Sequence, residues 1–203
     1  QAAPNADLDV LTALPNRTAL EARLAHAVAR CDSERRRLAL LVINLDGFKP
    51  VNATYGHLVG DQLLKHASRR MRRLMQPKDM LARLGSDVFA VLLTQQTERE
   101  PLTRLAERLI DAVGQPYRLG TKEVHLTCSI GIVLYPDHGD AERLIARRQP
   151  LLHAGRLVFA KARHDHDFAG EAPARVELRL RGQQVLETQR VGEGLRHQAR
   201  RGR

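Results

Sequence analysis

Two apolar stretches joined by a short turn constrain the fold of this 203-residue chain more than any other feature. The first stretch ends at Arg83, and the second runs from Val88 to Leu93. Between them, Gly85 and Ser86 predict a tight β-hairpin turn, because glycine adopts backbone angles that other residues avoid. Asp87 then stands at the hairpin tip. The chain must therefore contain a sheet with an acidic side chain at one turn.

The remaining patterns predict helices packed on that sheet. We expect helices at 17–30, 56–75 and 101–113, and strands at 38–45 and 124–134. The run at 38–45 is apolar except for Asn44, which is typical of a buried central strand. Asn16 and Thr18 are candidate caps of the first helix, and Leu58 is expected on the apolar face of the second. This order predicts an α+β fold with four or five mainly antiparallel strands.

Composition favours a globular domain with a basic tail. No apolar run approaches the roughly 18 residues that cross a membrane, and no leader is visible, so we expect a cytoplasmic chain without membrane contact. Cys31 and Cys128 lack metal spacing and are expected to be reduced and buried. Most of the net charge of +10 lies in residues 141–203, with 14 Lys+Arg against 7 Asp+Glu. With only 3% aromatic residues, no nucleic-acid partner is expected.

Five segments share their order and spacing with one known family. They are DVLTALPNR (9–17), NLDGFKPVN (44–52), GHLVGDQLL (56–64), RLGSDVF (83–89) and SIGIVLYPD (129–137). These segments resemble the motifs of the GGDEF (diguanylate cyclase) family. The resemblance implies the palm-like fold of nucleotide cyclases, an antiparallel sheet with a ferredoxin-like core and flanking helices. It implies a lead-in at 1–8 and a degenerate GGDEF domain at 9–168, divergent over 155–168.

The resemblance also implies a chemistry that this chain has largely lost. The family joins two GTP molecules into cyclic di-GMP, with Mg²⁺ held by three acidic residues. In this chain the three matching positions hold Asn44, Asp87 and Val88. Because Mg²⁺ prefers anionic oxygens, only Asp87 remains a good ligand. Asp46 lies about 6.6 Å further along its strand and does not compensate. Ser86 replaces a glycine, and a missing general base costs roughly 10²–10⁴ in rate. We expect no catalysis, and Mg²⁺ only if GTP binds.

The resemblance implies that the groups reading guanine are retained. Asn52 and Asp61 stand at the matching positions, where an amide and a carboxylate together contact the guanine edge. Gly85 and Lys161 are the other implied nucleotide contacts. The alternative is local: Asn52 would cap the following turn, and Asp61 would be favoured by the helix dipole.

Product inhibition in the family uses an Arg-x-x-Asp pair, for which this chain has Gln76 and Asp79. Glutamine cannot offer the forked cation that grips phosphate or guanine, so tight cyclic di-GMP binding is not expected. Residues 174–180 resemble the helix that links GGDEF domains to an EAL (phosphodiesterase) domain, within a basic tail at 169–203 that we expect to lack a stable fold. Three origins of this tail stay open: a remnant of a further domain, an artificial end and an altered reading frame.

Three functions are compatible with these patterns. The first, which we favour, is a catalytically inactive GGDEF module in cyclic di-GMP signalling, binding GTP weakly at most and regulating an EAL or sensory domain of a longer protein. The second is an active or weakly active diguanylate cyclase that works as a homodimer. The third is a protein-interaction platform that binds no nucleotide. The lost carboxylates argue against the second.

Overall fold

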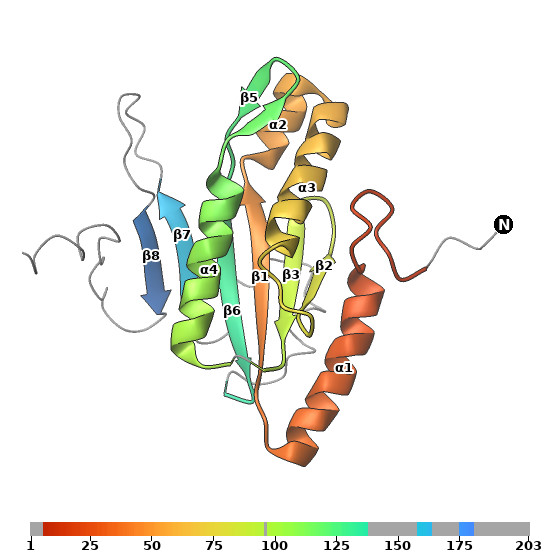
Figure 1. Ribbon diagram of the computed structural model, residues 1–203, viewed down its shortest axis with the longest axis vertical. Helices are drawn as coiled ribbons and strands as arrows, with labels where there is room; N and C mark the ends of the chain where they lie inside the picture. Colours follow the sequence, from red (N-terminus) through yellow and green to blue (C-terminus); the bar gives the residue numbers. More distant parts are fainter. Residues whose placement is uncertain (1–5, 96, 138–157, 164–174, 181–203) are drawn as a thin grey trace, which may run out of the picture.

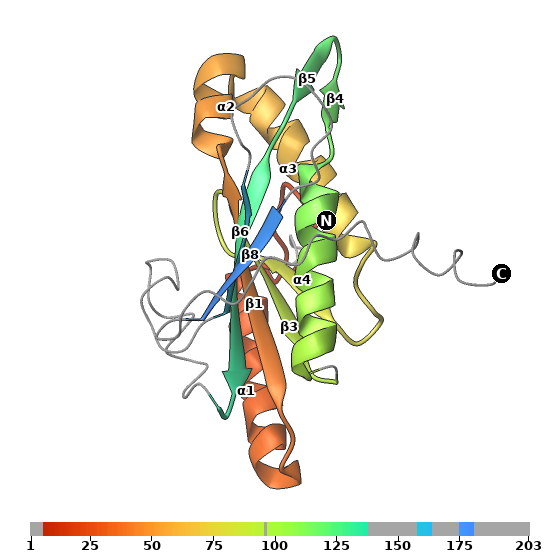
Figure 2. The ribbon, with the colours of Figure 1, turned by 90° about the vertical axis from the view of Figure 1, so that its left-hand side faces the viewer.

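The computed structural model describes residues 6–95 and 97–137, and the strands at 158–163 and 175–180. Its helices are α1 (Arg17–Glu34), α2 (Phe48–Tyr55), α3 (His57–Arg72) and α4 (Arg99–Gly114). Its strands are β1 (Leu38–Asp46), β2 (Met80–Arg83), β3 (Val88–Leu93), β4 (Tyr117–Leu119), β5 (Lys122–Val124), β6 (Thr127–Tyr135), β7 (Val158–Arg163) and β8 (Arg175–Leu180). The main sheet has the order β2-β3-β1-β6-β7-β8, with helices on both faces (Figures 1 and 2).

Every neighbouring pair in this sheet is antiparallel, which confirms the predicted α+β class. β1 lies between β3 and β6, as its largely apolar run predicts. Asn16 caps α1, since its side-chain oxygen accepts the Ala19 N–H at 3.0 Å. Cys31 and Cys128 are buried free thiols, also as expected. No helix among the described residues has the length and apolarity needed to span a bilayer.

The two faces of β1 are buried by different helices. Its odd-numbered residues, such as Leu41 and Ile43, pack into the larger core with α2, α3 and α4. Its even-numbered residues Leu38 and Leu40 pack with α1 in a second core. Side chains alternate along a strand, so Asn44 and Asp46 share the α1 face. They lie beyond the apolar residues that α1 covers and are partly exposed, and we call this part of the sheet its open end.

Several predicted elements differ from the observed ones. α2 and the β4–β5 hairpin were not predicted. With β7 and β8, the main sheet has six described strands, where four or five were expected. Residues 175–180 pair with β7 as a strand, so the prediction of a linker helix there is wrong. Leu58 is 81% exposed because the first turn of α3 lies beyond the end of β1 (Figure 1). The sequence at 141–146, which predicts the start of another helix, lies outside the described residues.

The loop before α1 holds a strained residue. Ala13, where the resembling motif has glycine, adopts a left-handed backbone with φ of 54°. This conformation costs a non-glycine residue about 1–2 kcal/mol, whereas glycine adds about 0.5–1 kcal/mol of unfolded-state entropy. We expect Ala13→Gly to raise the free energy of unfolding by about 0.5–1 kcal/mol, measured by urea denaturation. Ala22→Gly, in the exposed interior of α1, should instead lower it by about 1 kcal/mol. Equal losses in both variants would contradict the strain at Ala13.

Candidate functional site

One row of residues crosses the open end of the sheet. Asn44 lies opposite Val88 of β3 on one side and opposite Ser129 of β6 on the other. The Cα of Lys161 in β7 lies opposite that of Ser129. The structure thus aligns the sequence-predicted positions 44, 88 and 161 across four strands. Asp87, at the hairpin tip, accepts the Leu45 N–H through its backbone oxygen at 3.0 Å.

Asp46 is engaged by two hydroxyl groups that the sequence analysis did not single out. Its Oδ2 atom accepts a hydrogen bond from Ser129 Oγ at 2.8 Å and from Thr127 Oγ1 at 3.5 Å. Thr127 lies directly opposite Asp46 in the β1–β6 ladder, so the register explains the contact. The carboxylate is therefore held on β6, away from the hairpin acid. This arrangement agrees with the expectation that Asp46 does not replace the missing acids.

The hairpin tip is wider than the tight turn that the sequence predicts. Leu84 N–H donates to Val88 O at 2.8 Å, so three residues form the loop between them. Gly85 has no left-handed backbone, and a Cβ atom there would meet nothing within 4 Å. The predicted conformational need for glycine at this position is therefore wrong. Ser86 is exposed at the same tip.

Arg83 ties this tip to the N-terminal loop. Its guanidinium donates to Gly85 O at 3.0 Å and to Ser86 O at 2.8 Å. The same group binds both oxygens of Asp9 at 3.1 and 3.0 Å, and Asp9 also accepts the Thr12 N–H and hydroxyl. One planar cation therefore fixes two segments that lie 74 residues apart in the sequence. Only a fork-shaped donor makes all these bonds at once.

We expect Arg83→Ala to lower the free energy of unfolding by about 1.5–3 kcal/mol, because hydrogen bonds to charged groups contribute about that much. Arg83→Lys should recover little of this loss, since an ammonium cannot make the forked contact. Arg104→Ala is the matched control, because its pair with Glu100 is exposed and contributes at most about 1 kcal/mol. Urea denaturation measures all three, and equal losses in Arg83→Ala and Arg104→Ala would contradict the clamp.

The pH dependence of the clamp follows from Asp9. Burial raises the pKa of Asp9, but the hydrogen bonds from Thr12 and Arg83 lower it by more in total, so its pKa lies below 3.8. A carboxyl group with a lowered folded-state pKa stabilises the fold above its unfolded pKa and loses that contribution as the pH falls through the folded one. The difference between the parent and Arg83→Ala should therefore shrink below about pH 4.

Asn52 and Asp61 lie on the adjoining helices α2 and α3. The side-chain oxygen of Asn52 is buried and has no hydrogen-bond partner among the described residues. A Cβ atom on Gly60 would overlap this oxygen and lie 2.9 Å from Asn52 Cγ. Asp61, half-buried on the next position of α3, makes no hydrogen bond or ion pair within the described part of the chain. The Asn52 side chain does not cap the turn; its backbone oxygen accepts the Gly56 N–H instead.

Gln76 and Asp79 form a closed turn between α3 and β2. The Asp79 carboxylate accepts the Gln76 N–H at 2.8 Å, and the Asp79 N–H donates to Gln76 O at 3.0 Å. Burial raises the pKa of Asp79, and this hydrogen bond lowers it by less. The Asp79 side chain thus has a local structural role here.

The residues at the open end do not fit a two-Mg²⁺ centre. For a metal ion, Asp87 offers one carboxylate and Asn44 a neutral amide. The apolar side chain of Val88 offers no ligand atom. Within the described residues, no cluster of three or more His, Cys, Asp or Glu side chains could hold a metal. A small hard cation that requires near-octahedral anionic oxygens has too few ligands in this set.

Residues 6–154 match the family described as "Diguanylate cyclase, GGDEF domain". The chain belongs to the GGDEF family. It is 43% identical over 148 residues to the bifunctional diguanylate cyclase/cyclic di-GMP phosphodiesterase MucR of Pseudomonas aeruginosa, covering 72% of this chain and 22% of MucR. It is 38% identical over 142 residues to the cyclic di-GMP phosphodiesterase PdeR of Escherichia coli, covering 70% of this chain and 21% of PdeR.

Solved structures show the same fold. The GGDEF domain of TpbB from Pseudomonas aeruginosa superposes with a TM-score of 0.65 at 38% identity, covering 68% of this chain and 81% of that one. A sensory box/GGDEF family protein from Caulobacter crescentus gives 0.64 at 37% identity, covering 70% and 91%. The chain is thus a GGDEF domain of cyclic di-GMP signalling, and it spans about a fifth of the length of MucR and PdeR.

Proposed function

We propose that this GGDEF domain is a catalytically inactive regulatory module, which reads guanine nucleotides weakly and acts on an EAL or sensory domain of a longer protein. The observation that carries the proposal is the row Val88–Asn44–Ser129, which brings no acid to the position where the family gathers its carboxylates. Condensing two GTP molecules needs an activated 3′-hydroxyl and neutralised phosphates. Asn44 and Val88 supply neither a base nor a charge for this step.

Weak binding of the base is supported by the helix pair. Asn52 presents a buried oxygen without a partner, and a buried acceptor of this kind is costly until a donor fills it. The amino group of guanine is such a donor, and the half-buried Asp61 carboxylate can accept a second hydrogen bond from guanine N1–H. Adenine offers neither donor at these edges. The affinity should therefore come from the base more than from the phosphates.

We expect GTP and GDP to bind with similar weak affinity and with little dependence on Mg²⁺, and ATP to bind about tenfold more weakly. An unpaired buried carboxylate costs about 1–3 kcal/mol, enough for such a preference. Isothermal titration calorimetry with the three nucleotides measures it. Asp61→Ala should remove the preference for guanine, whereas Asp111→Ala, which removes an exposed acid of α4, should preserve it. Equal affinity for ATP and GTP in the parent protein would contradict the proposed guanine site.

We infer the wider role of the domain from its relatives. MucR and PdeR are several times longer than this chain, and both names include cyclic di-GMP phosphodiesterase activity. In this proposal, GTP bound to a domain that has lost two of its three acids biases a neighbouring domain without being converted. We therefore place the regulatory output in a neighbouring domain of the full protein. Any Mg²⁺ would arrive with the GTP phosphates.

A further inference from the structure

The last turn of α2 carries Asn52 at the exposed end of a short helix. α2 has only eight residues, and a helix of this length is not stable alone in water. Its buried residues are Phe48 and Val51, which anchor the first part of the helix in the larger core. Residues 53–55 are exposed. Contacts at this exposed end therefore decide how firmly the Asn52 side chain is held.

Lys122 of β5 makes a contact with this end of α2. Its ammonium nitrogen lies 5.0 Å from the centroid of the Tyr55 ring, within the range of a cation–π interaction. The neighbouring acid, Glu123, pairs instead with Arg118 and with His125. Within the described part of the chain, no carboxylate therefore draws the ammonium group away from the ring.

The hairpin that carries Lys122 is firmly attached at its base. Arg70 of α3 donates hydrogen bonds to three backbone oxygens at the end of α4 and before β4, those of Ala112, Gln115 and Pro116. Its guanidinium also stacks on the buried ring of Tyr117, 3.8 Å from the ring centroid. The β4–β5 hairpin therefore starts from a fixed point on α3.

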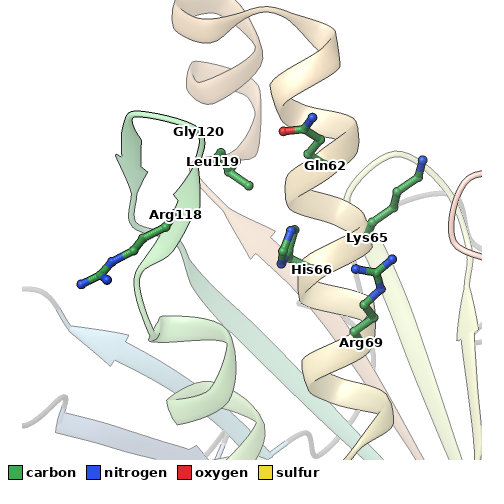
Figure 3. A pocket seen from close by; sticks show the side chains of 7 residues that line it. All are labelled: Gln62, Lys65, His66, Arg69, Arg118, Leu119 and Gly120. Carbon is green, nitrogen blue, oxygen red and sulfur yellow. The ribbon is translucent and has the colours of Figure 1, made fainter.

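The tip of the hairpin lies beside α2 and is separated from α3 by a cleft. This cleft has a volume of about 310 Å³ and lies between the hairpin turn and the side of α3 that faces it (Figure 3). Figures 1 and 2 show the hairpin and α2 at the same end of the molecule. At the start of α2, a Cβ atom on Gly47 would lie 3.9 Å from the side chain of Leu126, which follows β5. The hairpin segment thus meets α2 near Gly47 and again at Tyr55.

The contact with Tyr55 affects Asn52 through the last turn of α2. Tyr55 stands three residues after Asn52, so the two side chains are neighbours on the helix surface. The same turn is closed by the Gly56 N–H, which donates to the Asn52 backbone oxygen at 2.9 Å. The buried side-chain oxygen of Asn52 lies against Gly60, where a Cβ atom would not fit. A shift of this turn would therefore displace the oxygen.

We propose that Lys122 is a positioning residue for the guanine-reading Asn52 and that it acts through the ring of Tyr55. The inference rests on the proposed guanine site and adds the β4–β5 hairpin to it. Lys122 need not touch the nucleotide, because its role is to keep the last turn of α2 in place. The Asn52 oxygen then meets the amino group of guanine. Adenine lacks that amino group, so ATP binding does not depend on Lys122.

Calorimetric titration with GTP and ATP tests the proposal. A cation–π contact at an exposed site is strong enough for about a two- to fivefold effect, so Lys122→Ala should lower the ratio of GTP affinity to ATP affinity by that factor. Both nucleotides carry the same charge, so the ratio cancels the general loss of a cation. Tyr55→Leu should have the same effect, whereas Tyr55→Phe and Lys122→Arg keep the ring and the charge and should retain the parent ratio. Lys65→Ala, which removes an exposed cation of α3, should retain it as well.

A second measurement follows Asn52 without any nucleotide. In two-dimensional proton–nitrogen NMR spectra, the side-chain amide signal of Asn52 is identified by its loss in Asn52→Ala. This signal should shift in Lys122→Ala and Tyr55→Leu and stay near its parent position in Tyr55→Phe and Lys65→Ala. Tyr55, Lys65 and Lys122 are all exposed, so these variants should fold.

The two measurements separate the positioning role from the guanine site. An unchanged amide signal in Lys122→Ala would overturn the positioning role, as would an equal shift in Lys65→Ala. A parent protein that prefers guanine, with the same ratio in Lys122→Ala, would also overturn it and leave the guanine site standing. A parent protein without that preference, whose amide signal still moves in Lys122→Ala, would contradict the guanine site and support the positioning of Asn52.

Discussion

The triple variant Asn44→Asp/Ser86→Gly/Val88→Glu should convert the protein from one without detectable cyclic di-GMP synthesis into one that makes it. Positions 44 and 88 are direct cross-strand partners, with about 4.5–5.5 Å between Cα atoms. The new acids would therefore meet beside Asp87 and complete a seat for Mg²⁺. Restoring a general base alone is worth roughly 10²–10⁴ in rate. Chromatographic detection of cyclic di-GMP from GTP and Mg²⁺ measures the gain.

A matched variant separates the charge from the shape. Asn44→Asp/Ser86→Gly/Val88→Gln has nearly the same volume but one acid fewer, and it should stay inactive. Two acids placed opposite each other also repel, by up to about 1 kcal/mol, so Mg²⁺ should raise the melting temperature of the triple variant and leave that of the parent unchanged. If the triple variant folds, gains this response to Mg²⁺ and makes no product, then the loss of activity has another cause than the missing acids.

Gly60→Ala should abolish the preference for guanine nucleotides. The new Cβ atom would overlap the Asn52 side-chain oxygen, and Phe48 closes the other side with an atom 3.3 Å away. The amide must therefore move out of its buried position. The free energy of unfolding should fall by at most about 1–3 kcal/mol, because the end of the Asn52 side chain can shift and alanine favours the helix. Calorimetry with GTP and ATP measures the loss of preference.

A double-mutant cycle tests whether Gly60 acts through Asn52. If it does, Gly60→Ala and Asn52→Ala each weaken GTP binding, and the double variant is no worse than either. Gly114→Ala in α4 is the control, since a Cβ atom there meets nothing within 4 Å and GTP binding should be unaffected. Additive losses in the double variant would show that Gly60 serves the nucleotide by another route.

The sequence predicted the parts of the fold that depend on local pattern. The apolar run of β1 identified the central strand, and Asn16 identified the start of α1. α2 was missed because it is short and contains Pro50, which a first helical turn tolerates since its N–H groups lack helical partners. The β4–β5 hairpin had a readable signal, a two-residue turn beginning with Gly120, but its strands have only three residues each.

The sequence predicts candidate site positions but not the contacts between them. Motif spacing indicated Asn44, Asp87 and Asn52, yet only the sheet register shows that Asn44 and Val88 face each other. The clamp from Arg83 to Asp9 joins residues far apart in sequence, so no local pattern reveals it. The same holds for the hydroxyl of Ser129 on Asp46. Long-range pairs of this kind depend on the completed fold.

The most direct test of the account is a turnover assay on the unmodified protein. Purified protein is incubated with GTP and either Mg²⁺ or Mn²⁺, and cyclic di-GMP and pyrophosphate are quantified over time, with the TpbB GGDEF domain assayed in parallel for comparison. We expect no product above the protein-free blank with either metal. Robust synthesis of cyclic di-GMP by the unmodified chain would contradict the proposal that its missing carboxylates make it a silent module.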